Sequence, residues 1–137
     1  MMQDIFHNYC SGTDASKPQM ARFLTIYIDE AHARDEWWLP DSAGGRACIS
    51  NHTCLQDRLT AANRFVKDFD FPIETVCDSF DNEVNDRFEA WPERLYIVEK
   101  GVVVYQGGFG PFDYKLAEVK DWLAQRFGLR GEIIARR

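Results

Sequence analysis

The chain has 137 residues with 45% hydrophobic and 28% charged side chains, which is the size and composition of one soluble globular domain. Its formal net charge of -6 argues against non-specific nucleic-acid binding, because that binding needs a basic face. No apolar run approaches the roughly 20 residues of a membrane span, and the first residues lack the basic and apolar regions of a signal peptide, so the sequence as written predicts a soluble, cytoplasmic chain.

The first clear element in chain order is a strand at residues 23–28. The preceding residues 1–22 are harder to interpret: "MQDIFHNYC" is compatible with one or two helical turns, and "SGTDASKP" has the composition of a loop. The strand sequence "FLTIYI" is β-branched and aromatic without a charge, which is typical of a central strand covered on both faces. A long connection follows at 33–51, and loops of that length in compact domains are often functional.

A helix is predicted to begin near Thr53. Thr53 is the expected N-cap, and Gln56 three residues later completes a capping box. A short strand is then expected at 73–77, followed by a weak helix or irregular segment at 78–91. The apolar side chains of the helix recur at steps of three and four residues and form one face: Leu55, Leu59, Ala62, Val66 and Phe69.

The last third of the chain predicts a hairpin and a closing helix. The strands are expected at 94–98 and 102–106, joined by "EKG", in which Gly101 supplies the permissive backbone of a tight turn. An amphipathic helix is expected at 115–127 and is ended by Gly128. Its apolar face contains Leu116, Val119, Trp122, Leu123 and Phe127.

This order of elements predicts an α/β fold, a thioredoxin-like sandwich that is incomplete at the N-terminus, with a central mixed sheet flanked by helices. The expected organisation is a poorly defined segment at 1–22, the domain at 23–128 and a tail at 129–137. Pro92 directly precedes the first hairpin strand, where thioredoxin-like folds place a cis-proline beside the active site. We therefore expect a cis peptide bond there, with an ordinary trans proline at a strand start as the alternative.

The four cysteines are scattered without a CxxC pair. Cys48 and Cys54 flank His52, but zinc sites usually have more closely spaced ligand pairs. We therefore expect no metal site, and reduced thiols at Cys10, Cys48, Cys54 and Cys77.

Glu30 and His32 follow the first strand directly, at the end where open α/β sheets bind ligands. They are two residues apart, so both side chains point the same way if the extended backbone continues. A carboxylate beside an imidazole orients it and suits a proton donor near neutral pH. The alternative is a solvated strand end at which the histidine caps a neighbouring carbonyl group.

Three further residues have a structural and a functional interpretation. His52 stands before the predicted helix and, taken alone, favours a structural or solvent-facing role. Glu93 and Arg94 follow Pro92, and a local ion pair at a strand start explains them as well. If Pro92 is cis, both residues border the active-site groove.

Three segments resemble the iodothyronine deiodinase family in order and spacing: "FLTIYIDEAH", "HTCLQDRLTAA" and "PERLYIVEKGVVVYQGGFGPFDYKLAEVKDWL". The resemblance covers roughly residues 20–127. It implies a thioredoxin-like fold and the reductive removal of iodide from thyroid hormones. It also implies a selenocysteine or cysteine nucleophile and a thiol reductant as co-substrate, without a bound cofactor.

The resemblance also implies roles for individual residues. The catalytic set would be Glu30, His32, His52 and Glu93, with His32 contacting hormone or relaying a proton. Trp37 matches the tryptophan that follows the family's acidic-histidine motif. Trp37, Pro92 and Arg94 would bind the substrate, an iodinated aromatic small molecule. A homodimer could cover a sheet edge left open by a missing first strand.

The sequence departs from the family pattern around the nucleophile. Relatives carry it in a Ser-Cys-Thr-selenocysteine-Pro-Pro loop, and no such loop is visible here. Either the chain begins after that loop, or "KPQMAR" aligns just behind the nucleophile and Ser16 takes its place. Cys10 is the nearest thiol and the candidate nucleophile. Phe109 occupies a position that is basic in some relatives, and the family's membrane-anchoring helix is not visible.

Three functional hypotheses therefore remain open. The chain is a deiodinase-type reductive dehalogenase, truncated or misassembled around its nucleophile. Alternatively it is a thioredoxin-like thiol oxidoreductase or peroxidase that uses a lone cysteine such as Cys10. The third hypothesis is a non-catalytic relative that binds an aromatic ligand or a partner, or dimerises.

Overall fold

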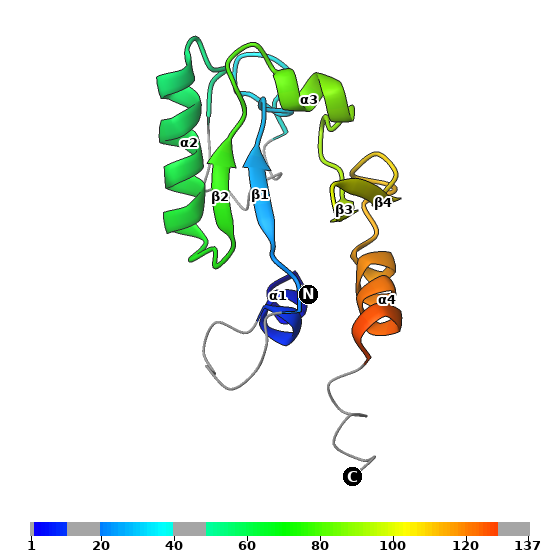
Figure 1. The fold of residues 1–137 in the computed structure, drawn as a ribbon. Coiled ribbons are helices and arrows are strands. Elements are labelled where there is room, and N and C mark those ends of the chain that lie inside the picture. The colour runs from blue at the N-terminus through cyan, green and yellow to red at the C-terminus, as the bar shows by residue number, and fades with distance from the viewer. Residues whose placement is uncertain (1, 11–19, 40–48, 129–137) are drawn as a thin grey trace. The chain divides into compact units, whose positions relative to one another are not determined.

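The computed structural model describes residues 2–10, 20–39 and 49–128 (Figure 1). Helices and strands follow one another in the order α1, β1, α2, β2, α3, β3, β4, α4, which confirms the predicted α/β class. The chain divides into two compact units, described separately below. Unit 2 contains the residues from Leu24 to Arg94 together with Phe109–Phe112, and unit 1 contains the remainder.

Unit 2 is built on a β-α-β arrangement. Strand β1 (Leu24–Tyr27) pairs in parallel with β2 (Glu74–Cys77), and α2 (Leu55–Asp68) connects them and packs along β2 (Figure 1). The short helix α3 (Glu83–Phe88) follows β2. Because the two strands are parallel, their carboxyl ends lie at the same edge of the sheet.

The prediction that the first strand is covered on both faces is wrong. Leu24 and Ile26 are exposed, whereas Thr25 and Tyr27 are partly buried. The Tyr27 ring lies 6.0 Å from the ring of Phe65 on α2. The sheet therefore has the alternating burial of a strand with one covered face.

The start of α2 differs from the predicted capping box by one residue. Cys54 is the N-cap, and the Asp57 carboxylate, not Gln56, closes the turn. Asp57 Oδ2 accepts hydrogen bonds from the Thr53 backbone N–H at 2.9 Å and from the Thr53 hydroxyl at 2.7 Å. These two bonds satisfy groups just ahead of the helix and fix its first turn.

The predicted apolar face of α2 is largely wrong. Leu55, Leu59 and Phe69 are exposed. The buried residues of the helix are Arg58, Ala61 and Ala62, so only Ala62 belongs to both sets. Small alanines allow the helix to approach the strands closely, and the buried arginine has polar partners that local periodicity does not reveal.

Unit 1 combines the N-terminal helix with the hairpin and the last helix. The predicted hairpin is present as β3 (Tyr96–Glu99) and β4 (Val102–Gln106), which pair antiparallel with an irregularity after Ile97. The helical turns expected near the N-terminus form α1 (Met2–Tyr9), and the predicted closing helix is α4 (Leu116–Phe127). The core consists of Ile5, Tyr9, Val119 and Leu123.

The single central mixed sheet of the prediction is not formed by the described residues. Their four strands form two separate pairs, β1 with β2 and β3 with β4, because no ladder of hydrogen bonds links the pairs. The predicted cis bond before Pro92 is present, and the bond before Pro111 is also cis. The domain limits of 23 and 128 stay a prediction.

The hairpin turn requires a left-handed backbone at Gly101. Lys100 has φ 52° and Gly101 has φ 81°, the pattern of a type I′ turn. No atom lies within 4 Å of a Cβ added at Gly101, so Gly101→Ala is expected to destabilise unit 1 by about 1 kcal/mol through its backbone alone. Urea denaturation measures this change. Gly101→Asn should cost less, and an equal loss in both variants would contradict the explanation.

Tyr105 on β4 predicts a loss of stability at alkaline pH. Its hydroxyl donates to Glu118 Oε2 at 2.8 Å. Burial first, and then the bond and charge of Glu118, raise the pKa of Tyr105 to about 12. The fold favours the neutral phenol, so its contribution is complete below about pH 10 and is lost as the pH rises through about 12.

We expect Tyr105→Phe to remove this alkaline loss of unit 1 stability. Urea denaturation at a series of pH values measures it, with Tyr96→Phe as the control tyrosine of the same hairpin. An unchanged alkaline loss in Tyr105→Phe would show that another group causes it.

Candidate functional site

Polar side chains gather in unit 2 where the parallel strands end. Asp29 and Glu30 follow β1, and His52 lies just before α2. We call Tyr27, Asp29, Glu30, His52 and Arg58 the His52 cluster. It occupies the edge of the sheet at which open α/β folds bind ligands.

The His52 imidazole lies between two carboxylates. Its side chain is 1% exposed, and its Nδ1 is 3.8 Å from Asp29 Oδ1. Its Nε2 is 3.8 Å from Glu30 Oε1. Neither ring nitrogen has a hydrogen-bond partner among the described residues. Buried polar groups are normally paired, so an imidazole in this state is a candidate for proton exchange.

Arg58 binds Asp29, one of the two carboxylates beside His52. Its side chain is 1% exposed. Its Nη2 donates to Asp29 Oδ1 at 3.2 Å and to Asn82 Oδ1 at 2.8 Å, and its Nη1 donates to the Ser79 carbonyl oxygen. The guanidinium thus joins α2 to the segments that follow both strands, and its charge is balanced mainly by Asp29.

Tyr27 binds Glu30, the other carboxylate beside His52. The Tyr27 hydroxyl donates a hydrogen bond to Glu30 Oε1. Burial, and then the bond and negative charge of Glu30, raise the pKa of Tyr27 far above its ordinary value. The phenol therefore remains a neutral donor at physiological pH.

The expected pairing of Glu30 with His32 is replaced by a pairing of Glu30 with His52. The extended backbone on which it depended ends at Tyr27, and the chain bends at Ala31 and His32. His32 Nδ1 instead lies 3.1 Å from the Trp37 carbonyl oxygen. This contact resembles the alternative in which the histidine caps a neighbouring carbonyl group.

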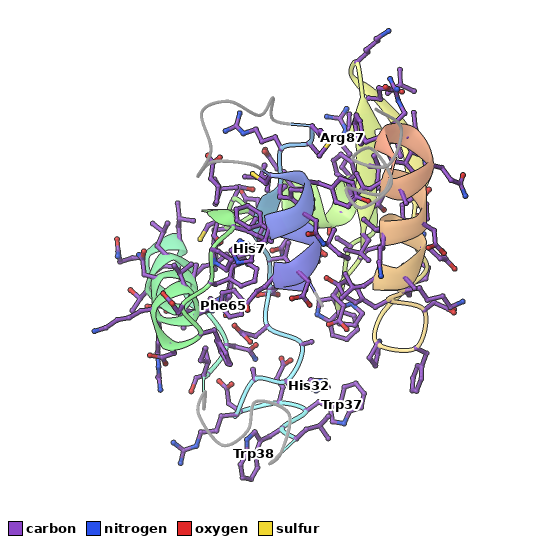
Figure 2. The ribbon with its side chains drawn as sticks, turned by 90° about the horizontal axis from the view of Figure 1, so that it is seen from below. His7, His32, Trp37, Trp38, Phe65 and Arg87 are labelled. Atoms are coloured by element: carbon purple, nitrogen blue, oxygen red, sulfur yellow. The ribbon has the colours of Figure 1, made fainter. Side chains whose placement is uncertain are left out.

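His32 and Trp37 form an aromatic pair on the segment after β1. Their rings are 4.8 Å apart in an edge-to-face arrangement, and Trp37 is 63% exposed. Figure 2 shows both side chains, with Trp38, on this same segment. The pair offers an apolar surface that an aromatic ligand could contact.

A local ion pair was expected at this strand start, and Arg94 forms one with Glu89. Arg94 Nη1 lies 3.5 Å from Glu89 Oε2 and 3.2 Å from the Glu89 carbonyl oxygen. Its guanidinium lies 4.1 Å from the centre of the Phe109 ring. The Glu93 carbonyl oxygen accepts the Gly110 N–H at 3.0 Å, which ties the two segments together.

An open hollow of about 340 Å³ lies beside this pair. Acidic and aromatic side chains line it, and Phe109 is one of them. Pro92 and Arg94, which the sequence predicts to contact substrate, belong to the adjoining segment. The lining residues are Asn85, Asp86, Glu89, Trp91 and Phe109.

The described thiols differ in their surroundings. Cys10 is partly buried just after α1, in unit 1, and its backbone N–H donates to the Phe6 carbonyl oxygen at 2.7 Å. Cys54 is exposed at the start of α2. Burial raises the pKa of Cys77, opposed by the charge of Arg58. Cys48 and Ser16 lie outside the described residues.

No three His, Cys, Asp or Glu side chains within 2–10, 20–39 and 49–128 are placed to hold a metal ion. Over the same ranges, no helix has the length and apolar character needed to cross a bilayer.

The sequence prediction missed Tyr27, Asp29 and Arg58. A signal for Arg58 is present in hindsight, because it is spaced three and four residues from Ala61 and Ala62 and so shares their side of the helix. No comparable signal marks Tyr27 or Asp29, because their roles depend on partners that the fold brings to them.

A family model described as "Iodothyronine deiodinase" matches residues 7–127. The chain is 38% identical over 115 residues to the type II iodothyronine deiodinase of Aquarana catesbeiana, which covers 82% of this chain and 43% of that protein. It is 44% identical over 100 residues to the type I iodothyronine deiodinase of Xenopus laevis, which covers 73% of this chain and 38% of that protein. The chain thus spans less than half the length of these curated relatives.

Proposed function

The chain belongs to the iodothyronine deiodinase family, and we propose that its site removes iodide reductively from iodinated aromatic molecules of the thyroid-hormone type. In this reaction a carbon–iodine bond is replaced by a carbon–hydrogen bond. Two thiols are oxidised to a disulfide, and iodide and a proton are released. The thiol reductant is the co-substrate, and no bound cofactor is required.

The His52 cluster supports this proposal because the reaction needs a proton at the ring carbon that loses iodine. The single observation that carries it is the buried imidazole of His52, which has no hydrogen bond at either nitrogen and a carboxylate 3.8 Å from each. Such an imidazole can give and regain a proton without first breaking a protein hydrogen bond. We assign His52 the role of proton donor and Glu30 that of the carboxylate that orients the imidazole and stabilises its protonated form.

The remaining site residues are assigned to substrate contact. The exposed ring of Trp37 and its edge-to-face partner His32 offer a surface for the iodinated ring. Pro92, Glu93 and Arg94 are proposed to border the bound molecule near the hollow that contains Phe109. We keep Glu93 as a catalytic carboxylate on the family resemblance alone.

The thioredoxin-like arrangement and a homodimer are also proposals. The parallel β-α-β arrangement followed by an antiparallel hairpin and a helix supports the first. The exposed apolar side chains of Leu24, Ile26 and Val76 support the second. Sedimentation equilibrium of the full chain tests the dimer, and a monomer at all concentrations would contradict it.

Iodide release from thyroxine by the purified chain with excess dithiothreitol tests the proposed function. Release that is lost in His52→Gln, and that in His32→Ala needs a higher thyroxine concentration, would support it. Cys10→Ser and Cys54→Ser, assayed separately, then identify which thiol is the nucleophile. Cys10 remains the proposed nucleophile, and full activity in Cys10→Ser would overturn that assignment.

Two other outcomes favour the competing hypotheses. Saturable binding of thyroxine, followed by Trp37 fluorescence with Trp37→Phe as control, but without iodide release, would make the chain a binding relative. Peroxide-dependent oxidation of one cysteine with turnover of a thiol, but without iodide release, would favour a thiol peroxidase.

A further inference from the structure

The two carboxylate oxygens that face His52 are each held by a second donor. Asp29 Oδ1 accepts from the Arg58 guanidinium at 3.2 Å. Glu30 Oε1 accepts from the Tyr27 hydroxyl. The same two oxygens lie 3.8 Å from the two ring nitrogens of His52. Distance therefore does not decide which nitrogen carries the proton when the imidazole is neutral.

Charge does distinguish the two sides. Arg58 brings a full positive charge to Asp29, whereas the Tyr27 phenol is neutral and leaves the charge of Glu30 uncompensated. The Asp29 side chain is also 39% exposed and the Glu30 side chain only 20%, so water screens Asp29 more strongly. Glu30 is consequently the stronger acceptor for a ring N–H.

We propose that Arg58 is a positioning residue that selects the Nε2–H tautomer of His52 by neutralising Asp29. The neutral imidazole then carries its proton on the nitrogen that faces Glu30, and Nδ1, facing the Arg58-paired Asp29, is unprotonated. This inference rests on the proposed function, in which His52 transfers protons, and it adds which proton is transferred. The imidazolium and the neutral Nε2–H ring differ only by the proton on Nδ1, so the exchanged proton is the one on Nδ1, while the Nε2–H stays directed at Glu30.

The tautomer of His52 can be measured without turnover. In the ¹⁵N-labelled full chain, long-range correlations between ring protons and ring nitrogens distinguish Nδ1–H from Nε2–H. The chain has three histidines, so His7→Gln and His32→Gln assign the signals. Spectra at about pH 9, above the usual histidine range, report the neutral ring.

The decisive comparison uses two substitutions of nearly unchanged volume. The unsubstituted chain and Asp29→Asn are both expected to show the Nε2–H form. Glu30→Gln should move most of the population to Nδ1–H, because Asp29 is then the remaining carboxylate of the His52 cluster. A predominantly Nδ1–H form in the unsubstituted chain, or an equal change in Asp29→Asn and Glu30→Gln, would overturn the proposal.

Arg58 itself is tested by a second pair of variants. Arg58→Met should raise the Nδ1–H share at least severalfold, and adding Asp29→Asn to it should restore Nε2–H. A folded Arg58→Met that keeps the original tautomer would overturn the role of Arg58. If this variant does not fold, Arg58→Gln, which keeps an amide donor but not the positive charge, takes its place, and a folded Arg58→Gln with an unchanged tautomer would equally overturn the role of Arg58.

A matched control separates a specific change of the His52 tautomer from a nonspecific effect of substitution on the packing around the ring. Asp57→Asn changes another aspartate near His52, one that bonds Thr53, and should leave the tautomer unchanged. A change as large as that of Glu30→Gln would contradict the proposal. Because these spectra need no catalysis, a failure of the tautomer proposal and a failure of the deiodination proposal are observed independently.

Discussion

Arg58→Met is expected to destabilise unit 2 by about 3–5 kcal/mol, the cost typical of removing one partner from a buried ion pair. The Arg58 side chain is 1% exposed and donates to three oxygens, one in the segment after β1 and two in the segment after β2. Methionine fills part of the volume but donates nothing, so the Ser79 carbonyl and the Asn82 side chain lose a charged donor. The segments after β1 and β2 then lose the group that joins them to α2.

Hydrogen exchange of individual amides under denaturant measures this effect where it arises. Protection should fall along β1 and β2, while the amides of α1 and α4 in unit 1 serve as an internal reference. Arg64→Met is the matched control, because Arg64 lies on the same helix and makes an exposed ion pair with Asp68 at 3.3 Å. We expect its cost to stay within about 0.5 kcal/mol. If Arg58→Met and Arg64→Met lowered the stability of unit 2 by similar amounts, the burial of Arg58 would contribute little to that stability.

The elements that the sequence predicted well are those specified locally. The turn at Lys100 and Gly101 needs only adjacent residues of the right backbone preference, and the hairpin follows from it. The apolar stripe of α4 also matched, with Val119 and Leu123 in the core of unit 1. In both cases the residues that the local pattern marks are the ones that form the turn or enter the core, so the sequence alone is sufficient to predict them.

The buried face of α2 could not be predicted in the same way. Periodicity favoured Leu55 and Leu59, but the helix buries Arg58, whose partners Asp29 and Asn82 lie 29 and 24 residues away. A buried arginine is stable only with such partners, and they become neighbours only after the strands pair. The exposed leucines follow from a sheet of two strands, which is too narrow to cover a wide helical face.

The candidate site was also predictable only in part: residues that belong to it could be named from the sequence, but their mutual position could not. The sequence placed Glu30 and His32 in a site at a strand end, and the family resemblance added His52 to that site; these assignments stay proposals. The mutual position of these residues could not be predicted, because it depends on where β1 stops being extended. The bends at Ala31 and His32 turn His32 toward Trp37 and leave Glu30 beside the other histidine. One backbone change thus decides which imidazole meets the carboxylate.

His52→Gln is expected to lower kcat for iodide release by about 10²–10⁴-fold, the usual contribution of a positioned acid or base. Glutamine nearly fills the space of the imidazole but cannot give up a proton at neutral pH. His32→Ala should instead act mainly on KM, because His32 is assigned to substrate contact through its pairing with Trp37. His7→Gln, on α1 in unit 1, is the control histidine and should change neither constant.

The split between kcat and KM is what separates the two proposed roles. If His52→Gln raised KM and left kcat unchanged, the buried imidazole would be a binding group and the proton would have another source. If His32→Ala lowered kcat as strongly as His52→Gln, proton transfer would involve both histidines. The bend after β1 would then have to straighten during turnover, since the structure holds His32 Nδ1 3.1 Å from the Trp37 carbonyl oxygen.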